Sequence, residues 1–365
     1  MIPLVDLSLD YYSHKKEIEK VIGEVLKSGW FILGPKVLEF ESNFANYIGV
    51  KEAIAVASGT EALQLSLLAC GIRPDDGVIL PVNAYPTAFA VASTGANLQL
   101  VDIDKETYLL DPEKAEKAIN RKTKAIITVH LYGQPARMVF FKKLAEKYNL
   151  SLIEDCAQAH GAAYKKEMVG SIGKCGCFSF YPTKNLGGYG DGGMVVTNKQ
   201  KISQRLRRLR NYGEKNRYES LELGINSRLD EIQAAILNMK LKYLARNNRK
   251  RRIAASYYNN ILRKTPLILP KEDERCYHVY HLYVVRAPER DSLKKFLQEK
   301  GITTAIHYPS PIHWQKSFSY LGYKRGNFPI AEKACEEILS LPLFPQIKRD
   351  QQDKVMQAIL EYYGK

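Results

Sequence analysis

Apolar positions recur along this chain with two different periods, and the order of the two changes after residue 197. Up to that point, short apolar runs alternate with segments in which apolar residues recur every three or four positions. Short runs are typical of buried strands, and the longer period is typical of helices with one buried face. Because alternating strands and helices form βαβ units, this part predicts a mostly parallel, seven-stranded-type sheet covered by helices on both faces.

The expected elements of this first part are named by residue range. Strands are expected over 53–59, 77–82, 98–104, 124–133, 150–155, 177–181 and 194–197. Helices are expected over 14–28, 37–48, 60–71, 87–93, 112–119 and 137–148, and the first of them carries Ile18, Val21, Ile22 and Val25 on one face.

After Thr197 the pattern indicates a different organisation. Helices are expected over 200–211, 228–262, 292–301, 329–340 and 350–363, and strands over 277–287 and 302–309. Strands mixed with helices after one long helix predict a smaller α+β unit. We therefore divide the chain into a large domain, residues 1–245, and a small C-terminal domain, residues 246–365.

Composition narrows the class of protein. No apolar run approaches the roughly 18 to 20 residues of a membrane span. The first twenty residues lack a basic start followed by an apolar core, so no signal peptide is expected. Six scattered cysteines show no metal-binding spacing. These features predict a cytoplasmic protein with reduced thiols.

Charge is unevenly distributed along the chain. The net charge is +15, and residues 201–252 carry fifteen Lys or Arg against five Asp or Glu. A basic segment can bind nucleic acid, but no zinc-finger or RNA-binding signature accompanies it. A solvated helix face beside an anion site explains the same residues. We expect a phosphorylated small molecule and no nucleic acid, and a DNA-binding regulator remains the remote alternative.

Reactive groups follow four of the expected strands. Ser58-Gly59-Thr60 begins a helix, where free N–H groups favour a phosphate, although Ser and Thr are also ordinary caps there. Tyr85 follows the second strand and could stack on a flat ring or be a half-buried aromatic. Ligands bind beyond the carboxyl ends of strands in open parallel sheets.

The two remaining strand ends carry acids and an amine. Glu154 and Asp155 point to opposite sides of a strand, so one carboxylate can enter a site while the other does not. Ser179 and Lys184 follow a buried aromatic run. Burial there would favour the neutral, nucleophilic form of the lysine, although a surface lysine in a hairpin loop is the alternative.

The glycine cluster at 188–193 matches G-x-G-x-x-G literally. A dinucleotide-binding loop requires a strand before this motif and a helix after it. The β-branched run MVVT follows here and predicts a strand, which excludes nicotinamide or flavin binding on this motif. The glycines instead allow close backbone approach around Lys184.

Phosphate anchors, a stacking aromatic, a carboxylate and an amine together fit one cofactor, pyridoxal phosphate. The carboxylate would keep the ring nitrogen protonated, and the lysine would hold the aldehyde and later shuttle a proton. Several motifs carry a resemblance to one family: GTEAL (59–63), IEDCAQAHG (153–161), SFYPTKNLG (179–187), GDGG (190–193) and GINSRLDEIQAAIL (224–237). On these motifs the chain resembles the DegT/DnrJ/EryC1/StrS sugar aminotransferases, fold-type-I pyridoxal phosphate enzymes acting on nucleotide-linked keto-sugars.

The resemblance implies roles for the residues around the cofactor ring. Lys184 is similar to the Schiff-base lysine, and Asp155 to the partner of the pyridine nitrogen. Gln158 would contact the ring hydroxyl, and Tyr85 would stack on the ring. The segment PVNAYPTAF around Tyr85 departs from the family pattern, which more often has a Thr before the aromatic residue.

The resemblance also implies phosphate ligands and a partner subunit. Gly59, Thr60 and Ser179 would bind the phosphate. Asn226 is similar to a family asparagine that reaches the phosphate of the neighbouring subunit. The family likeness therefore implies a homodimer with two shared sites.

Substrate residues and reaction type follow from the same likeness. Arg228, His307 and Tyr308 are candidate substrate contacts, and GINSRLD and IHYP are most similar to members that aminate carbon 3 of the sugar. An ion-paired arginine and a buried His-Tyr pair are the structural alternatives. The implied reaction moves an amino group from L-glutamate to a dTDP- or UDP-linked 3-keto-sugar. A 4-keto substrate is the first alternative and a sugar dehydratase the second, although family dehydratases carry histidine in place of Lys184.

Overall fold

A computed structural model describes residues 1–364, and its largest element is a seven-stranded sheet. The strand order is β1-β9-β8-β5-β4-β2-β3. Only β9 runs against its neighbours, so the sheet is mostly parallel, as the sequence predicts. The strands span β1 (Glu52–Val56), β2 (Gly77–Pro81), β3 (Asn97–Val101), β4 (Thr123–Val129), β5 (Ser151–Asp155), β8 (Cys175–Ser179) and β9 (Gly193–Thr197).

Helices cover both faces of this sheet. They are α1 (Leu7–Ser28), α2 (Pro35–Ile48), α3 (Gly59–Ala69), α4 (Tyr85–Ala92), α5 (Pro112–Ala118), α6 (Met138–Lys147), α7 (Gln200–Leu209) and α8 (Glu231–Leu241). Successive side chains of β1 point to opposite faces of the sheet. Ala53 and Ala55 belong to the core under α2 and α8. Ile54 and Val56 belong to the larger core on the other face. The α/β class expected from the sequence is confirmed.

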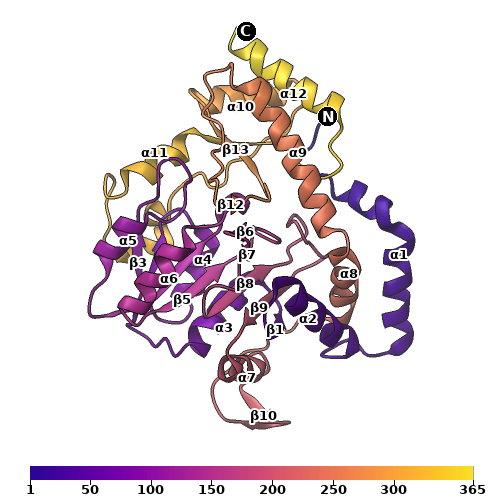
Figure 1. Ribbon diagram of the computed structural model, residues 1–365, viewed down its shortest axis with the longest axis vertical. Coiled ribbons are helices and arrows are strands. Elements are labelled where there is room, and N and C mark those ends of the chain that lie inside the picture. Colours follow the sequence, from indigo (N-terminus) through magenta and orange to yellow (C-terminus); the bar gives the residue numbers. More distant parts are fainter. Residues whose placement is uncertain (365) are drawn as a thin grey trace.

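The C-terminal part is built around a third apolar cluster. Helices α9 (Leu244–Leu262), α10 (Arg290–Glu299) and α12 (Arg349–Tyr362) surround the antiparallel pair β13 (Tyr283–Arg286) and β14 (Ile338–Leu341). Helix α11 (Pro329–Glu337) packs against the larger core instead. In Figure 1, α9 leads from the sheet to this part, where both chain ends lie beside α12. A separate core of this kind supports the proposal that a domain boundary lies near residue 245.

The single long helix expected over 228–262 is wrong, because the chain forms α8 and α9 with a turn at 242–243. Neither Gly nor Pro marks this break. Helix α8 packs against α1 and α2, whereas Ala254, Ala255 and Tyr258 of α9 belong to the C-terminal cluster. Packing against two different cores therefore sets the turn, which periodicity along the chain does not reveal.

Three further expectations in the C-terminal part need correction. Residues 302–309 form no strand and make only single bridges, through Ile302 to Ile2 and through Ala305 to Ser340. The helix expected over 329–340 ends at Glu337, because the chain then turns extended and pairs as β14 with β13. Of the strand expected over 277–287, only Tyr283–Arg286 pairs in this sheet.

Short strands that the sequence did not indicate complete the fold. β6 (Ala163–Tyr164), β7 (Glu167–Met168) and β12 (Cys276–Tyr277) form a small sheet. β10 (Glu214–Asn216) and β11 (Glu219–Ser220) form a hairpin that extends below α7 in Figure 1. Three short 3₁₀ helices lie at Leu131–Gly133, Ile312–Trp314 and Lys316–Leu321. Within residues 1–364, no helix combines the length and the apolar character that crossing a membrane requires.

Candidate active site

A cavity of about 350 Å³ lies at the carboxyl edge of the large sheet, and we call it the main cavity. The ends of β1, β5 and β8 all contribute to its wall, as expected for an open parallel sheet. It brings together eight of the eleven residues singled out from the sequence: Gly59, Thr60, Asp155, Gln158, Ser179, Lys184, His307 and Tyr308.

The N-terminus of α3 forms an anion-binding cradle on one wall. The Ser58 hydroxyl accepts the N–H of Glu61 at 3.1 Å, and the Ser58 carbonyl accepts the next N–H along the helix. The N–H groups of Gly59 and Thr60 have no partner within residues 1–364. A Cβ added at Gly59 would lie 2.6 Å from the Cβ of Ser179, so only glycine lets the helix start this close to β8. Free N–H groups at a helix start favour a phosphate.

Asp155 supplies a buried carboxylate that has no counter-ion in the described chain. Its Oδ2 accepts the hydroxyl of Thr87 at 2.7 Å, and its Oδ1 accepts the N–H of Ala157 at 3.1 Å. No Lys, Arg or His within residues 1–364 forms an ion pair with it. Because an unpaired buried carboxylate is costly, this position suits a cationic group of a ligand.

Glu154 lies on the opposite side of β5, as the two-residue period predicts. Its carboxylate accepts the N–H groups of Gly170 and Gly173, and it contacts Nε2 of His130 at 3.1 Å. His130 Nδ1 accepts the N–H of Ala136. His130 and Glu154 lie with Cys156 in a group of potential metal ligands, but their hydrogen-bonding atoms are already used within the fold.

Lys184 extends from the loop after β8 into the main cavity. Burial lowers the pKa of its amine to about 8, and the carboxylate of Asp155 opposes that change only in part. The amine has no hydrogen-bond partner within residues 1–364. A lysine with this pKa carries a large neutral fraction near pH 8 and can act as a nucleophile.

Gln158 has a defined amide orientation. Its Oε1 accepts the N–H of Tyr132 at 2.7 Å, which leaves the amide NH₂ free to donate into the main cavity. His307 and Tyr308 close the cavity from the C-terminal part of the chain. Burial lowers the pKa of His307 to about 4 and raises the pKa of Tyr308 to about 12, so both side chains are neutral at neutral pH.

Three residues singled out from the sequence do not line the main cavity. Tyr85 is the first residue of α4 rather than part of a loop, and its ring lies 5.9 Å from the ring of Tyr308 at the cavity margin. Asn226 is exposed and forms a bridge with Asn211. Arg228 donates to the side-chain oxygen of Asn211 at 2.9 Å. Asn226 and Arg228 thus contact Asn211 and do not line this chain's own cavity.

Thr87 and His281 are two polar residues of the cavity wall that sequence reasoning missed. Thr87 lies in the first turn of α4, two positions after Tyr85, and only the fold brings its hydroxyl to Asp155. His281 lies in the run YHVYHLYVV, whose alternation indicates a strand and gives no sign that one histidine reaches the sheet edge.

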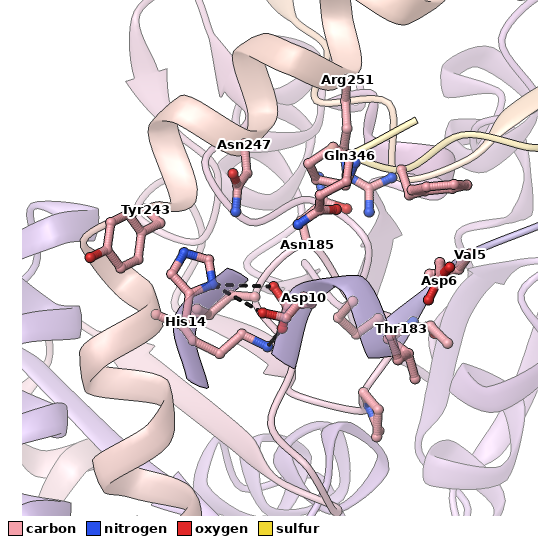
Figure 2. A pocket seen from close by; sticks show the side chains of 17 residues that line it. Val5, Asp6, Asp10, His14, Thr183, Asn185, Tyr243, Asn247, Arg251 and Gln346 are labelled. Atoms are coloured by element: carbon pink, nitrogen blue, oxygen red, sulfur yellow. Dashed lines mark hydrogen bonds and ion pairs between the residues drawn. The ribbon is translucent and has the colours of Figure 1, made fainter. Parts of the chain in front are cut away.

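A second, smaller pocket lies behind Lys184, and we call it the α1 pocket. It is bounded by the start of α1, the loop 182–186 and one face of α8 and α9. Figure 2 shows Asp10 and His14 of α1 on one side, with Asn185 and Arg251 nearby. Asp10 forms an ion pair with Lys240 at 2.6 Å. Lys184 belongs to the walls of both this pocket and the main cavity.

The main cavity therefore fits pyridoxal phosphate on three independent features. All three line this one cavity: an anion cradle at Gly59 and Thr60, an unpaired buried carboxylate at Asp155, and an amine of lowered pKa at Lys184. These are the groups that hold a phosphate, a protonated ring nitrogen and an aldehyde.

Comparisons with known proteins agree with this geometry. A 363-residue match, 46% identical and covering 99% of both chains, is to a dTDP-3-amino-3,6-dideoxy-alpha-D-galactopyranose transaminase of Aneurinibacillus thermoaerophilus. A UDP-N-acetyl-3-dehydro-alpha-D-glucosamine 3-aminotransferase of Acidithiobacillus ferrooxidans is 43% identical over 98% of this chain and 97% of its own. The solved structure of DesV from S. venezuelae superposes with a TM-score of 0.98 at 40% identity, covering 100% and 99% of the two chains.

The family comparison covers almost the whole sequence. The profile of the DegT/DnrJ/EryC1/StrS aminotransferase family matches residues 12–360. Enzymes of this family use pyridoxal 5'-phosphate as cofactor. With the sheet, the cavity and the lysine all in place, the chain belongs to the DegT/DnrJ/EryC1/StrS aminotransferase family.

Proposed function

We propose that this enzyme transfers an amino group from L-glutamate to the 3-keto carbon of a nucleotide-linked sugar. The observation that carries the proposal is the placement of Lys184 and Asp155 in one cavity beside the cradle at Gly59. Two relatives named for amino transfer at carbon 3, one on a dTDP-sugar and one on a UDP-sugar, support the choice of position.

When bound, pyridoxal phosphate supplies an aldehyde that carries the amino group and a ring that withdraws electrons. Gly59, Thr60 and Ser179 would hold its phosphate, and the Gln158 amide would donate to its ring hydroxyl. Asp155 would keep a proton on the ring nitrogen. Thr87 holds that carboxylate in place through its hydroxyl.

Lys184 has two tasks in this proposal. Its neutral amine would bind the cofactor covalently, and burial makes that form accessible near pH 8. Once released, the same amine would take a proton from the donor and return it to the acceptor carbon. Tyr308 forms part of the wall of the cavity in which this proton would move.

Residues at the margin of the main cavity would contact the ring and the sugar. Tyr85 would stack on the cofactor ring from the start of α4, beside Tyr308. His307 and Tyr308 would contact the sugar as neutral hydrogen-bonding groups. Arg228 would meet the substrate of a neighbouring site, since its guanidinium does not line this chain's own cavity.

We propose a homodimer in which each subunit completes the other's site. Asn226 is exposed, does not line its own cavity and would reach the phosphate bound by the partner subunit. We also propose that the enzyme is cytoplasmic, because all six cysteines are free, as is usual for proteins in a reducing compartment.

The alternatives lack a supporting observation. A dehydratase of this family would need histidine at position 184, where this chain has lysine. A regulator that binds DNA would use the basic segment 201–252, but within its α7 part Arg207 and Arg210 pair with Glu41, and Arg205 and Arg208 pair with Glu222. Amination at carbon 4 remains an outcome of the substrate test.

That test offers glutamate with a panel of 3-keto and 4-keto dTDP- and UDP-sugars to the purified, cofactor-loaded enzyme. We expect formation of 2-oxoglutarate and an amino sugar with 3-keto compounds. Turnover of 4-keto compounds alone would contradict the proposed position. Release of ammonia without an amino-sugar product would contradict amino transfer itself.

A further inference from the structure

His281 lies on the wall of the main cavity with Lys184. Its ring is buried, with Nδ1 placed 3.1 Å from the side-chain oxygen of Asn185. Its Nε2 has no hydrogen-bond partner within residues 1–364, and neither has the amine of Lys184. Two unpartnered nitrogens therefore face one cavity.

The hydrogen bonds of Asn185 decide which nitrogen of His281 carries the proton. The Asn185 amide nitrogen donates to the carbonyl of Val279 at 3.2 Å and to the side-chain oxygen of Asn248 at 2.9 Å. A carbonyl can only accept, so the amide orientation of Asn185 is determined. Its oxygen must then accept from His281 Nδ1–H. The Nε2 of the neutral ring consequently carries a lone pair.

Charges around His281 keep the ring neutral. Arg251 donates to the His281 carbonyl at 3.2 Å and to that of Leu343 at 3.0 Å, which anchors this segment on α9. In Figure 2 its guanidinium lies near Asn185 at the α1 pocket. Burial lowers the pKa of His281 well below its ordinary value, and the positive charges of Lys184 and Arg251 lower it further. Asp155, whose charge raises the pKa of Lys184, and Asp191 are the acids that line the same cavity.

We propose that His281 is a positioning residue for Lys184, with Nε2 as the hydrogen-bond acceptor for the lysine ammonium. The hydrogen bonds from Asn185 to Asn248 and from His281 to Asn185 fix the ring so that this lone pair lies on the cavity wall. It would orient the amine for proton transfer within each half of the reaction. The importance of this contact rests on the role proposed for Lys184 in amino transfer.

The test measures Lys184 in the cofactor-free protein, so its result does not depend on turnover. Trace acetylation with acetic anhydride across pH, quantified by mass spectrometry of the peptide containing Lys184, reports the pKa of the amine. We expect a midpoint near pH 8 in the wild type. In His281→Phe it should fall by about one unit, because a hydrogen bond that stabilises the ammonium is lost. His281→Gln, which restores an acceptor, should return it to the wild-type value.

His160→Phe is the matched control. His160 also lies near Lys184, but it does not line the main cavity and its ring packs against Phe178 and Phe180, so its loss should leave the midpoint unchanged. If His281→Phe does not fold, Asn185→Leu removes the partner of Nδ1 and should also lower the midpoint. An unchanged or raised midpoint in the folded variants would overturn the proposal. If the midpoint falls in His281→Phe as expected but the wild-type enzyme has no aminotransferase activity, only the proposed function is contradicted.

Discussion

The hydroxyl of Thr87 donates a 2.7 Å hydrogen bond to Oδ2 of Asp155, and both side chains are buried. This contact joins the first turn of α4 to the end of β5. Thr87→Val should lower the free energy of unfolding by about 1–3 kcal/mol, because the buried carboxylate loses a hydrogen-bond donor. Urea denaturation checks the value. Thr87→Ser keeps the hydroxyl and should lose much less unfolding free energy. Equal losses of unfolding free energy in both variants would mean that packing, and not the hydrogen bond, causes the effect.

A second buried acid joins α2 and α8, two of the helices that cover the sheet. Glu231, at the start of α8, accepts the N–H groups of Gly34, Lys36 and Val37 at the start of α2. Glu231→Ala should cost about 2–4 kcal/mol of unfolding free energy, since several donors at a helix N-terminus lose one charged acceptor. Glu231→Gln retains one acceptor and should cost less. Chemical denaturation that shows equal stability for all three proteins would contradict this role.

The lowered pKa of Lys184 has a direct consequence for cofactor uptake. Only the neutral amine attacks the aldehyde, and its fraction rises about tenfold per pH unit below the pKa. Covalent uptake of pyridoxal phosphate by the cofactor-free enzyme should therefore accelerate with pH and level off above about pH 8. Stopped-flow absorbance provides the rates. An acceleration that continues unchanged up to pH 10 would mean that burial does not lower the pKa.

Much of the main cavity could be predicted from the sequence because its residues follow buried strands. Lys184 and Asp155 lie directly after apolar runs, and parallel strands bring such ends to one edge. His281 and Thr87 could not be found this way, since their neighbours in the chain carry no such signal. Their contacts with Asn185 and Asp155 exist only after distant segments pack together.

The boundaries that were mispredicted share a physical cause. Residues 228–262 keep one helical pattern through the turn at 242–243, and residues 338–341 follow a helix without Gly or Pro. The turn at 242–243 and the change from helix to strand at 338 both depend on which core the following residues join. Local patterns do not contain that information.

The homodimer proposal has its own test, based on mixing two inactive variants. Asn226→Ala should impair the site of the partner, and Lys184→Ala should inactivate its own. After unfolding and refolding together in equal amounts, half of the dimers contain one intact site, so activity should recover to about one quarter of the wild type. The same variants refolded separately are the control. No recovery would contradict a site shared between subunits.

Transfer of nitrogen to carbon 3 of a nucleotide-linked sugar is the measurement that tests the central claim most directly. The enzyme is loaded with pyridoxal phosphate and given ¹⁵N-labelled glutamate and a 3-keto dTDP- or UDP-sugar. We expect ¹⁵N at carbon 3 of the product by NMR with the wild type. Lys184→Ala, checked for its fold by circular dichroism, should lose at least about 10³-fold in rate. Labelled product at an undiminished rate from Lys184→Ala would contradict the account, as would the absence of label at carbon 3 with the wild type.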